Sequence, residues 1–152
     1  MCFQERRIFK LQGRPVLATT AHSHNLSRLF FVNDRISGKK FLIDTGAEIS
    51  VLPPSSVRHR LSPAKLTLQA ANGSRIETYG EKSLTLDLGL RRKLQWIFII
   101  ADIKQPIIGA DFLSSFDLAV DMKHKRLIDQ TTSLHISGIQ STISSSGITH
   151  IN

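Results

Sequence analysis

The chain alternates between short apolar runs and polar turns, a pattern typical of a protein built mainly from β-strands. A polar loop at residues 33–38 joins the first two predicted strands, and Asn72 with Gly73 suits the positive φ angles of a tight hairpin turn. Two prolines donate no backbone N–H, so strand pairing is expected to stop within residues 51–56, where a short helical turn starts. The predicted strands cover residues 29–32, 40–43, 65–70, 74–79, 83–88, 94–100, 106–109, 120–122 and 126–129.

Apolar residues at helical spacing predict one short helix over residues 110–116. The two flanks of the chain differ from the part between them. Residues 1–26 show no clear periodicity and are interpreted as a basic leader or linker. Residues 130–152 hold ten Ser or Thr among 23 residues and no charged side chain, which indicates a linker or a disordered tail. A single domain at residues 27–129 agrees with a length of 152 residues.

The net charge of +8 is concentrated near the N-terminus, because residues 1–40 hold eight basic and two acidic residues. Such an excess attracts nucleic acid by neutralising phosphates. Spaced basic residues without an aromatic platform more often form a solvated linker, and we favour that interpretation. The alternative, a nucleic-acid-binding leader, predicts salt-dependent RNA binding that is lost when residues 1–26 are removed.

The composition favours a soluble protein of a reducing compartment, and we expect an intracellular, cytoplasmic location without membrane contact. Cys2 is the only cysteine, so neither an internal disulfide nor a zinc knuckle can form. The longest apolar run, residues 96–101, is far below the ~20 residues that span a bilayer. His22 and His24 lack cysteine or acidic companions, which favours solvated linker residues, and we predict no metal site.

The candidate chemistry begins with Asp44, Thr45 and Gly46, which directly follow an apolar run. The predicted strand therefore delivers a carboxylate at its end, where glycine lets the backbone turn and approach a substrate closely. By itself this tripeptide also fits an ordinary strand-ending turn. Three further features accompany it: Ala47 directly after it, the Asn–Gly hairpin, and the apolar segment at residues 107–111.

With these features the chain resembles the retroviral-type aspartic proteases, or retropepsins, and most closely the protease of LTR-retrotransposon Gag-Pol polyproteins. The resemblance covers roughly residues 28–129. Residues 41–47 match the family's hydrophobic–Asp-Thr-Gly-Ala signature, and residues 107–113 match the hydrophobic–hydrophobic–Gly segment before its C-terminal helix. The resemblance implies a mainly β fold, a retropepsin-like closed β-barrel that forms half of an acid protease, with a flap hairpin and one short C-terminal helix.

The resemblance also implies roles for individual residues. Asp44 would be catalytic, Thr45 would hydrogen-bond across a dimer axis, and Gly46 would accept the substrate backbone. Ala47 and Glu48 would help line the cleft. The flap would be formed by Ala71, Asn72, Gly73 and Ser74, and the substrate cleft with its supports by Ile107, Ile108, Gly109, Ala110 and Asp111.

Peptide hydrolysis by carboxylates needs two of them facing one water, and this chain holds one Asp-Thr-Gly. A twofold-symmetric homodimer places Asp44 opposite its own copy. The pair would share one proton, so that one carboxylate activates water while the other polarises the peptide carbonyl. The resemblance thus implies an aspartic endopeptidase that needs no cofactor and acts on polypeptides, in retroelement polyprotein processing.

The chain departs from the family in three places and leaves the role of one aspartate open. Glu48 stands where many retroviral members carry Asp, Ala110 stands where many carry an Arg that ties the site loop to the helix and the dimer, and the flap has Asn72 and Gly73 in place of a run of glycines. Ala110 supports the alternative of a catalytically weak or inactive dimerisation or peptide-binding domain. Asp111 is either a reactive acid or a partner of the helix N-terminus, and its place in the first turn favours the second.

Overall fold

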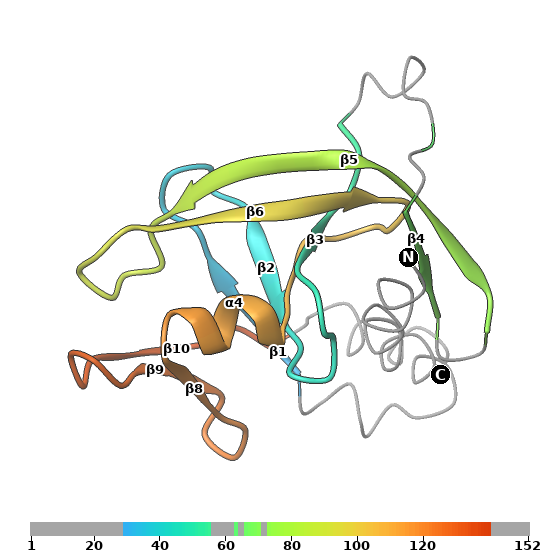
Figure 1. The fold of residues 1–152 in the computed structure, drawn as a ribbon. Helices are drawn as coiled ribbons and strands as arrows, with labels where there is room; N and C mark the ends of the chain where they lie inside the picture. The colour runs from blue at the N-terminus through green and yellow to red at the C-terminus, as the bar shows by residue number, and fades with distance from the viewer. Residues whose placement is uncertain (1–28, 56–62, 64–65, 71–72, 141–152) are drawn as a thin grey trace, which may run out of the picture.

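The computed structural model describes residues 29–55, 63, 66–70 and 73–140. The mainly β class with one short helix is confirmed (Figure 1). Within the described part of the chain no helix is long and apolar enough to cross a membrane. The elements are β1 (Phe30–Asn33), β2 (Lys40–Ile43), β3 (Val51–Leu52), β4 (Thr67–Gln69), β5 (Arg75–Leu86), β6 (Leu94–Ala101), β7 (Ile107–Ile108), α4 (Ala110–Ser115), β8 (Leu118–Asp121), β9 (Arg126–Asp129) and β10 (His135–Ser137).

Seven strands form one sheet in the order β1-β2-β7-β3-β6-β5-β4. The predicted hairpin of β1 and β2 is present as an antiparallel pair, while β2 runs parallel to β7 and β3 runs parallel to β6. The expected closed barrel is not observed, because β1 and β4 at the two ends of the order do not pair. The free edge of β1 instead pairs Phe31 with Ile139, whose backbone groups exchange two hydrogen bonds of 2.8 Å.

Two local predictions in the middle of the chain differ from the structure. The strands predicted at residues 74–79 and 83–88 are one long strand, β5, with an irregularity in its pairing between Thr78 and Glu81. Gly80 between them has a φ of +114°, so a bulge bends the strand at the gap between the two predicted strands. Strand pairing stops after β3, before the two prolines, but residues 53–55 form no helical turn.

The C-terminal sheet contains β8, β9 and β10 in the antiparallel order β10-β9-β8. Its third strand lies in the segment that was assigned to a linker or disordered tail, so that boundary is wrong for residues 130–140. Gly138 after β10 packs on the Phe30 ring so closely that a Cβ there would lie 2.0 Å from Phe30 Cδ2. The predicted leader, residues 1–26, and residues 141–152 lie outside the described residues.

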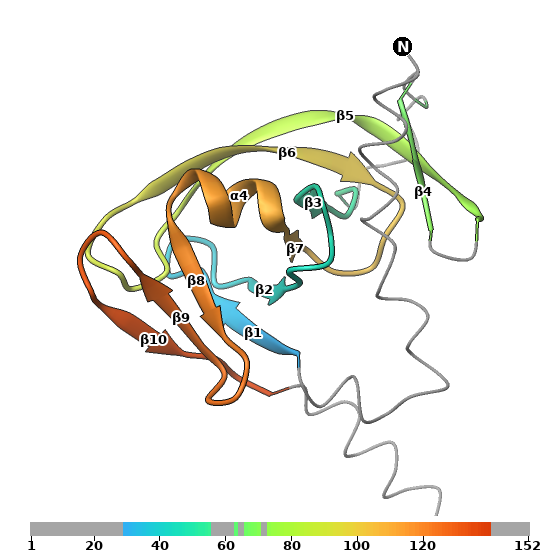
Figure 2. The same ribbon diagram turned by 60° about the horizontal axis from the view of Figure 1, so that its bottom comes forward.

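The long pair of β5 and β6 arches over α4, and the C-terminal sheet lies beside the helix (Figure 2). A helix of six residues is not stable alone, so packing holds α4 in place. Its buried Phe112 contacts the Phe116 ring at a centroid distance of 4.8 Å and the Trp96 ring on β6 at 6.1 Å. The helix thereby belongs to the main core, whose largest buried side chains include Phe30, Phe41 and Phe98.

Candidate active site

Asp44 follows β2, whose last three residues are buried. The Asp44 N–H donates to the Ile108 carbonyl at 3.1 Å, which extends the pairing of β2 with β7 by one residue. Behind it the chain turns sharply: the Ala47 N–H donates to the Asp44 carbonyl at 3.0 Å, and the Gly46 N–H donates to Asp44 Oδ1 at 3.0 Å. These bonds fix the carboxylate in a tight loop, where the side chain is fully buried in the single chain.

The other residues of this loop differ in exposure. Thr45 is exposed at its tip, Gly46 is half-buried, and Ala47 is fully buried in the second core cluster. Glu48 is half-buried, and one of its carboxylate oxygens, Oε1, is buried without a hydrogen-bond partner among the residues that the structure describes. The loop therefore has an exposed threonine at its tip and, among the described residues, a carboxylate oxygen without a donor.

The structure brings the predicted segment at residues 107–111 against this loop. Ile107 and Ile108 form β7 beside β2 and are buried. The Ala110 N–H donates to the Ala47 carbonyl at 2.7 Å. A Cβ at Gly109 would lie 2.7 Å from the Ala47 carbonyl oxygen, so glycine permits this close approach of two backbones.

Asp111 lies in the first turn of α4, as predicted, but its carboxylate is directed mostly to other segments. Oδ1 accepts from Ser50 Oγ at 2.6 Å and from the Phe112 N–H at 2.7 Å. Oδ2 accepts from the Ser50 N–H at 3.1 Å and from Trp96 Nε1 at 3.2 Å. Ser50 and Trp96 were not predicted as site residues, and no local pattern could show that they meet Asp111 61 and 15 positions away.

The predicted flap is only partly described, because Ala71 and Asn72 lie outside the described residues. Gly73 has a φ of +90°, and its N–H donates to the Ala70 carbonyl at 2.8 Å, as expected for a tight turn. The Ala70 N–H in turn donates to the Ser74 carbonyl at 2.7 Å. The hairpin thus joins β4 and β5, at the edge of the sheet opposite β1.

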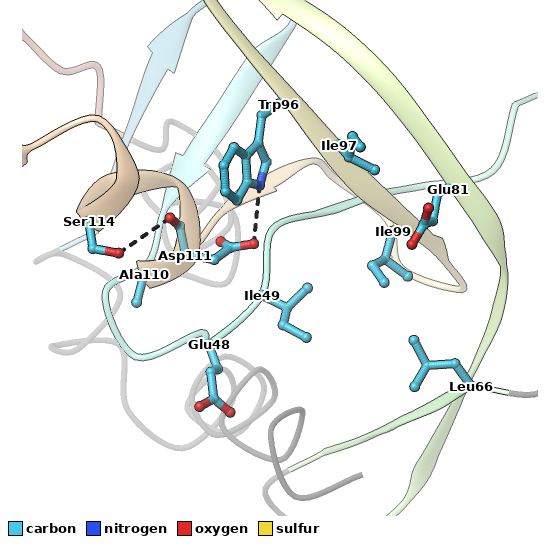
Figure 3. A pocket seen from close by; sticks show the side chains of 10 residues that line it. All are labelled: Glu48, Ile49, Leu66, Glu81, Trp96, Ile97, Ile99, Ala110, Asp111 and Ser114. Atoms are coloured by element: carbon cyan, nitrogen blue, oxygen red, sulfur yellow. Dashed lines mark hydrogen bonds between the residues drawn. The ribbon is translucent and has the colours of Figure 1, made fainter. Parts of the chain in front are cut away.

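A cavity of about 650 Å³ lies between the Asp44 loop, the β5–β6 pair and α4 (Figure 3). Its volume is within the range of small-ligand and side-chain sites. Among the described residues, the walls combine aliphatic side chains with three carboxylates and no Lys or Arg. The lining residues are Glu48, Ile49, Leu66, Glu81, Trp96, Ile97, Ile99, Ala110, Asp111 and Ser114. No group of three metal-ligating side chains occurs among the residues that the structure describes.

The family model for the retroviral aspartyl protease matches residues 11–121 of the chain. The chain belongs to the retroviral aspartyl protease family. The match begins inside the segment predicted as a leader, and it ends before β9 and β10. The Asp44 loop, the flap hairpin and residues 107–111 all fall within the part that is shared with this family.

A solved structure of a retroviral protease-like domain shares the fold. The retroviral protease-like domain of Ddi1 from Leishmania major is 17% identical, with a TM-score of 0.54, and the alignment covers 73% of this chain and 94% of that domain. The EIAV protease, solved in complex with the inhibitor HBY-793, is 22% identical with a TM-score of 0.47, over 61% of this chain and 90% of that one. The chain is a retropepsin-like domain in which β9 and β10 lie beyond the family match.

Proposed function

We propose that this retropepsin-like domain is an aspartic endopeptidase that acts as a homodimer on polypeptides. The observation that carries the proposal is the Asp44 loop itself, in which the Ile108 carbonyl and the Gly46 and Ala47 N–H groups hold a family aspartate in one orientation. The sequence contains this Asp-Thr-Gly once, so two chains are needed for a pair of carboxylates.

In the proposed dimer, Asp44 from each chain faces its copy across a twofold axis. Two carboxylates a few ångströms apart do not both ionise readily, so the pair shares one proton. The ionised member takes a proton from water, the water oxygen attacks the peptide carbonyl carbon, and the protonated member donates to the carbonyl oxygen. The exposed hydroxyl of Thr45 is available for a bond to the partner copy.

The substrate would lie as an extended peptide along the loop and the cavity. Glu48 lines the cavity, and its Oε1 has no hydrogen-bond partner in the described part of the chain, so we expect it to accept from a peptide backbone N–H. Because Asp44 is fully buried in the single chain, hydrolysis requires the loop to become accessible when two chains and a peptide assemble. Polyprotein junctions of a retroelement are the substrate class that the family membership supports.

Digestion of a peptide library at mildly acidic pH tests the proposal, with the Asp44→Asn variant beside the unchanged chain. Loss of the acid–base pair is expected to lower kcat/KM by at least ~10²–10⁴-fold. Asp102→Asn is the matched control, because Asp102 is an exposed aspartate outside the loop. Cleavage that survives Asp44→Asn, or no cleavage by the unchanged chain, would overturn the proposal.

A second candidate function is a peptide-binding dimer without turnover. It is favoured by Ala110 at the position of the family's arginine and by the complete burial of Asp44. Sedimentation and peptide-binding measurements beside the digestion separate the two functions. Stable dimers that bind peptides with no turnover would favour this second function over the first.

A further inference from the structure

The carboxylate of Asp111 is the meeting point of three segments that are distant in sequence. It accepts four hydrogen bonds: two from Ser50, one from the Phe112 N–H and one from Trp96 Nε1. Ser50 continues the Asp44 loop into β3, Phe112 belongs to α4, and Trp96 belongs to β6. A residue that only capped its helix would need the Phe112 bond alone, so the other three require a different explanation.

Ser50 passes this connection on to the other side of the loop. Its side chain is fully buried, and its hydroxyl donates to Asp111 Oδ1. The hydroxyl oxygen of Ser50 in turn accepts from the Gly109 N–H at 2.8 Å. The hydroxyl therefore links the segment after Asp44 to the segment after β7. A buried hydroxyl that loses its partner is destabilised, which makes this link costly to break.

Gly109 stands between two direct contacts to the Asp44 loop. On one side Ile108 accepts from the Asp44 N–H, and on the other side the Ala110 N–H donates to the Ala47 carbonyl. Movement of residues 108–110 would therefore move the catalytic loop. The chain of contacts runs from Asp111 through Ser50 to Gly109 and from there to both ends of the tight turn.

We propose that Asp111 is a positioning residue for the Asp44 loop, which it holds through Ser50 and fastens to β6 through Trp96. This inference rests on the proposed function as far as kinetics are concerned, and it concerns the orientation of Asp44 without contact to the reacting atoms. In a chain with Ala110 in place of the family's arginine, neutral donors and one carboxylate thereby hold the loop without a cation.

Kinetics of a graded series of variants test the proposal. Asp111→Ala removes all four bonds and is expected to lower kcat by about 10²-fold with KM changed less than about threefold, since small misplacements of a catalytic group have effects of this size. Asp111→Asn keeps the shape and one accepting oxygen, and is expected to lower kcat less. Trp96→Phe removes one donor while the ring stays packed on Phe112, so its effect should be the smallest of the three.

Amide hydrogen exchange of the full chain provides a readout that needs no turnover. In the Asp111 variants, exchange at the Gly46, Ala47 and Gly109 amides should speed up, while the Asp129 amide in the C-terminal sheet keeps its protection. Asp121→Asn is the control, because in the described part of the chain the side chain of this aspartate bonds only within its own hairpin of β8 and β9. The control is expected to leave both kcat and exchange in the Asp44 loop unchanged.

Three results would overturn the proposal: an unchanged kcat in Asp111→Ala, a loss confined to KM, or exchange that rises equally in the loop and the C-terminal sheet. The last would mean that Asp111 only stabilises the whole fold. If the unchanged chain cleaves nothing, the proposed function fails, while the local or global pattern of exchange still decides the role of Asp111.

Discussion

Two aspartates anchor the two ends of α4 with different chemistry. At its start, Asp111 binds Ser50 and Trp96, which are neutral donors. Near its end, the Arg92 guanidinium donates to both oxygens of the buried Asp129, at 2.8 and 3.1 Å, and to the Phe116 carbonyl at 2.7 Å. The first anchor faces the Asp44 loop, and the second holds the C-terminal sheet beside the helix (Figure 2).

The two anchors differ in the charge of their donors and therefore in the strength of their bonds. A charged fork on a carboxylate gives shorter and stronger bonds than neutral donors do. It also brings a positive charge, which would favour ionisation of nearby carboxylates. The charged pair of Arg92 and Asp129 lies at the C-terminal sheet, away from the proposed catalytic pair. At the Asp44 loop the donors to Asp111 are neutral: the hydroxyl and amide of Ser50 and the indole of Trp96. The two regions should therefore respond differently to substitution, acid and salt.

A methyl group added to one glycine in each region should give the largest effects, on stability at Gly138 and on kcat at Gly109. In Gly138→Ala the new Cβ would lie 2.0 Å from Phe30 Cδ2, and this fully buried ring has no free space, so we expect a loss of about 3 kcal/mol in the free energy of unfolding. In Gly109→Ala the new Cβ meets backbone oxygens of Ala47 and Ile49 at 2.7 and 3.0 Å, and the loop must shift.

Urea unfolding and cleavage rates measured together distinguish the two variants. Gly138→Ala should lose mainly stability, whereas Gly109→Ala should lose about 1–2 kcal/mol of stability and a larger share of kcat. A Gly138→Ala variant as stable as the unchanged chain would contradict the close packing of the C-terminal sheet on β1. Full activity in Gly109→Ala would contradict the tight contact between the two backbones.

Removal of the ion pair of Arg92 and Asp129 should give the next largest loss of stability. Arg92→Ala leaves the buried Asp129 without its cation, and we expect about 2–3 kcal/mol of lost stability, below the ~3–5 of a fully buried pair because the Arg92 side chain is 32% exposed. The kcat of the proposed endopeptidase activity should stay unchanged in the folded variant. Lys93→Ala is the matched control, because Lys93 is an exposed neighbour. Urea midpoints that are equal for both variants would show that the ion pair contributes nothing.

Acid should weaken the ion-paired region within a defined pH window. The Arg92 guanidinium beside Asp129 holds the pKa of that carboxyl below its usual 3.8. Burial raises the pKa of Asp34, but hydrogen bonds from Asp87, Ser37 and Ile36 outweigh it, and the pKa is lowered overall. As the pH falls below about 4, the unfolded chain binds protons that the folded chain does not, so stability declines until the folded pKa values are passed.

Unfolding by urea at a series of pH values checks this prediction. Stability should be nearly constant from neutral pH to about 5 and fall below about 4. Asp129→Asn should flatten the decline. A stability that rises on acidification through this window would mean that folding raises the pKa values of Asp34 and Asp129, which contradicts the prediction.

The sequence predicted those features that neighbouring residues determine. The hairpin of β1 and β2 and the position of Asp44 directly after β2 followed from apolar runs that end in polar residues. The strand β10 was missed because its one apolar residue, Ile136, stands between His135 and Ser137 in a segment rich in Ser and Thr. Its pairing depends on β9, which a scan for alternation does not take into account.

The same limit applies to the candidate site. The loop and residues 107–111 were identified from the motif that each carries, and the structure places them in contact. The partners of Asp111 could not be identified, because Ser50 and Trp96 reach it only through the pairing of β3 with β6 and β7. Tertiary contacts of this kind depend on the sheet order, which no single segment of the chain encodes.

The smallest effect is expected at the tip of the C-terminal sheet. Arg126 and His124 bond to Asp121 and hold the pKa of its carboxyl well below the usual range, but the group lies at the surface. Exposed pairs contribute little and are screened by salt. Asp121→Asn should therefore shift the urea midpoint slightly at low salt and not at 1 M NaCl, whereas the deficit of Arg92→Ala should persist at both. If Asp121→Asn lost the same stability at both salt concentrations, the Asp121 pairs would behave like the buried pair of Arg92 and Asp129, and the predicted contrast between the two would be wrong.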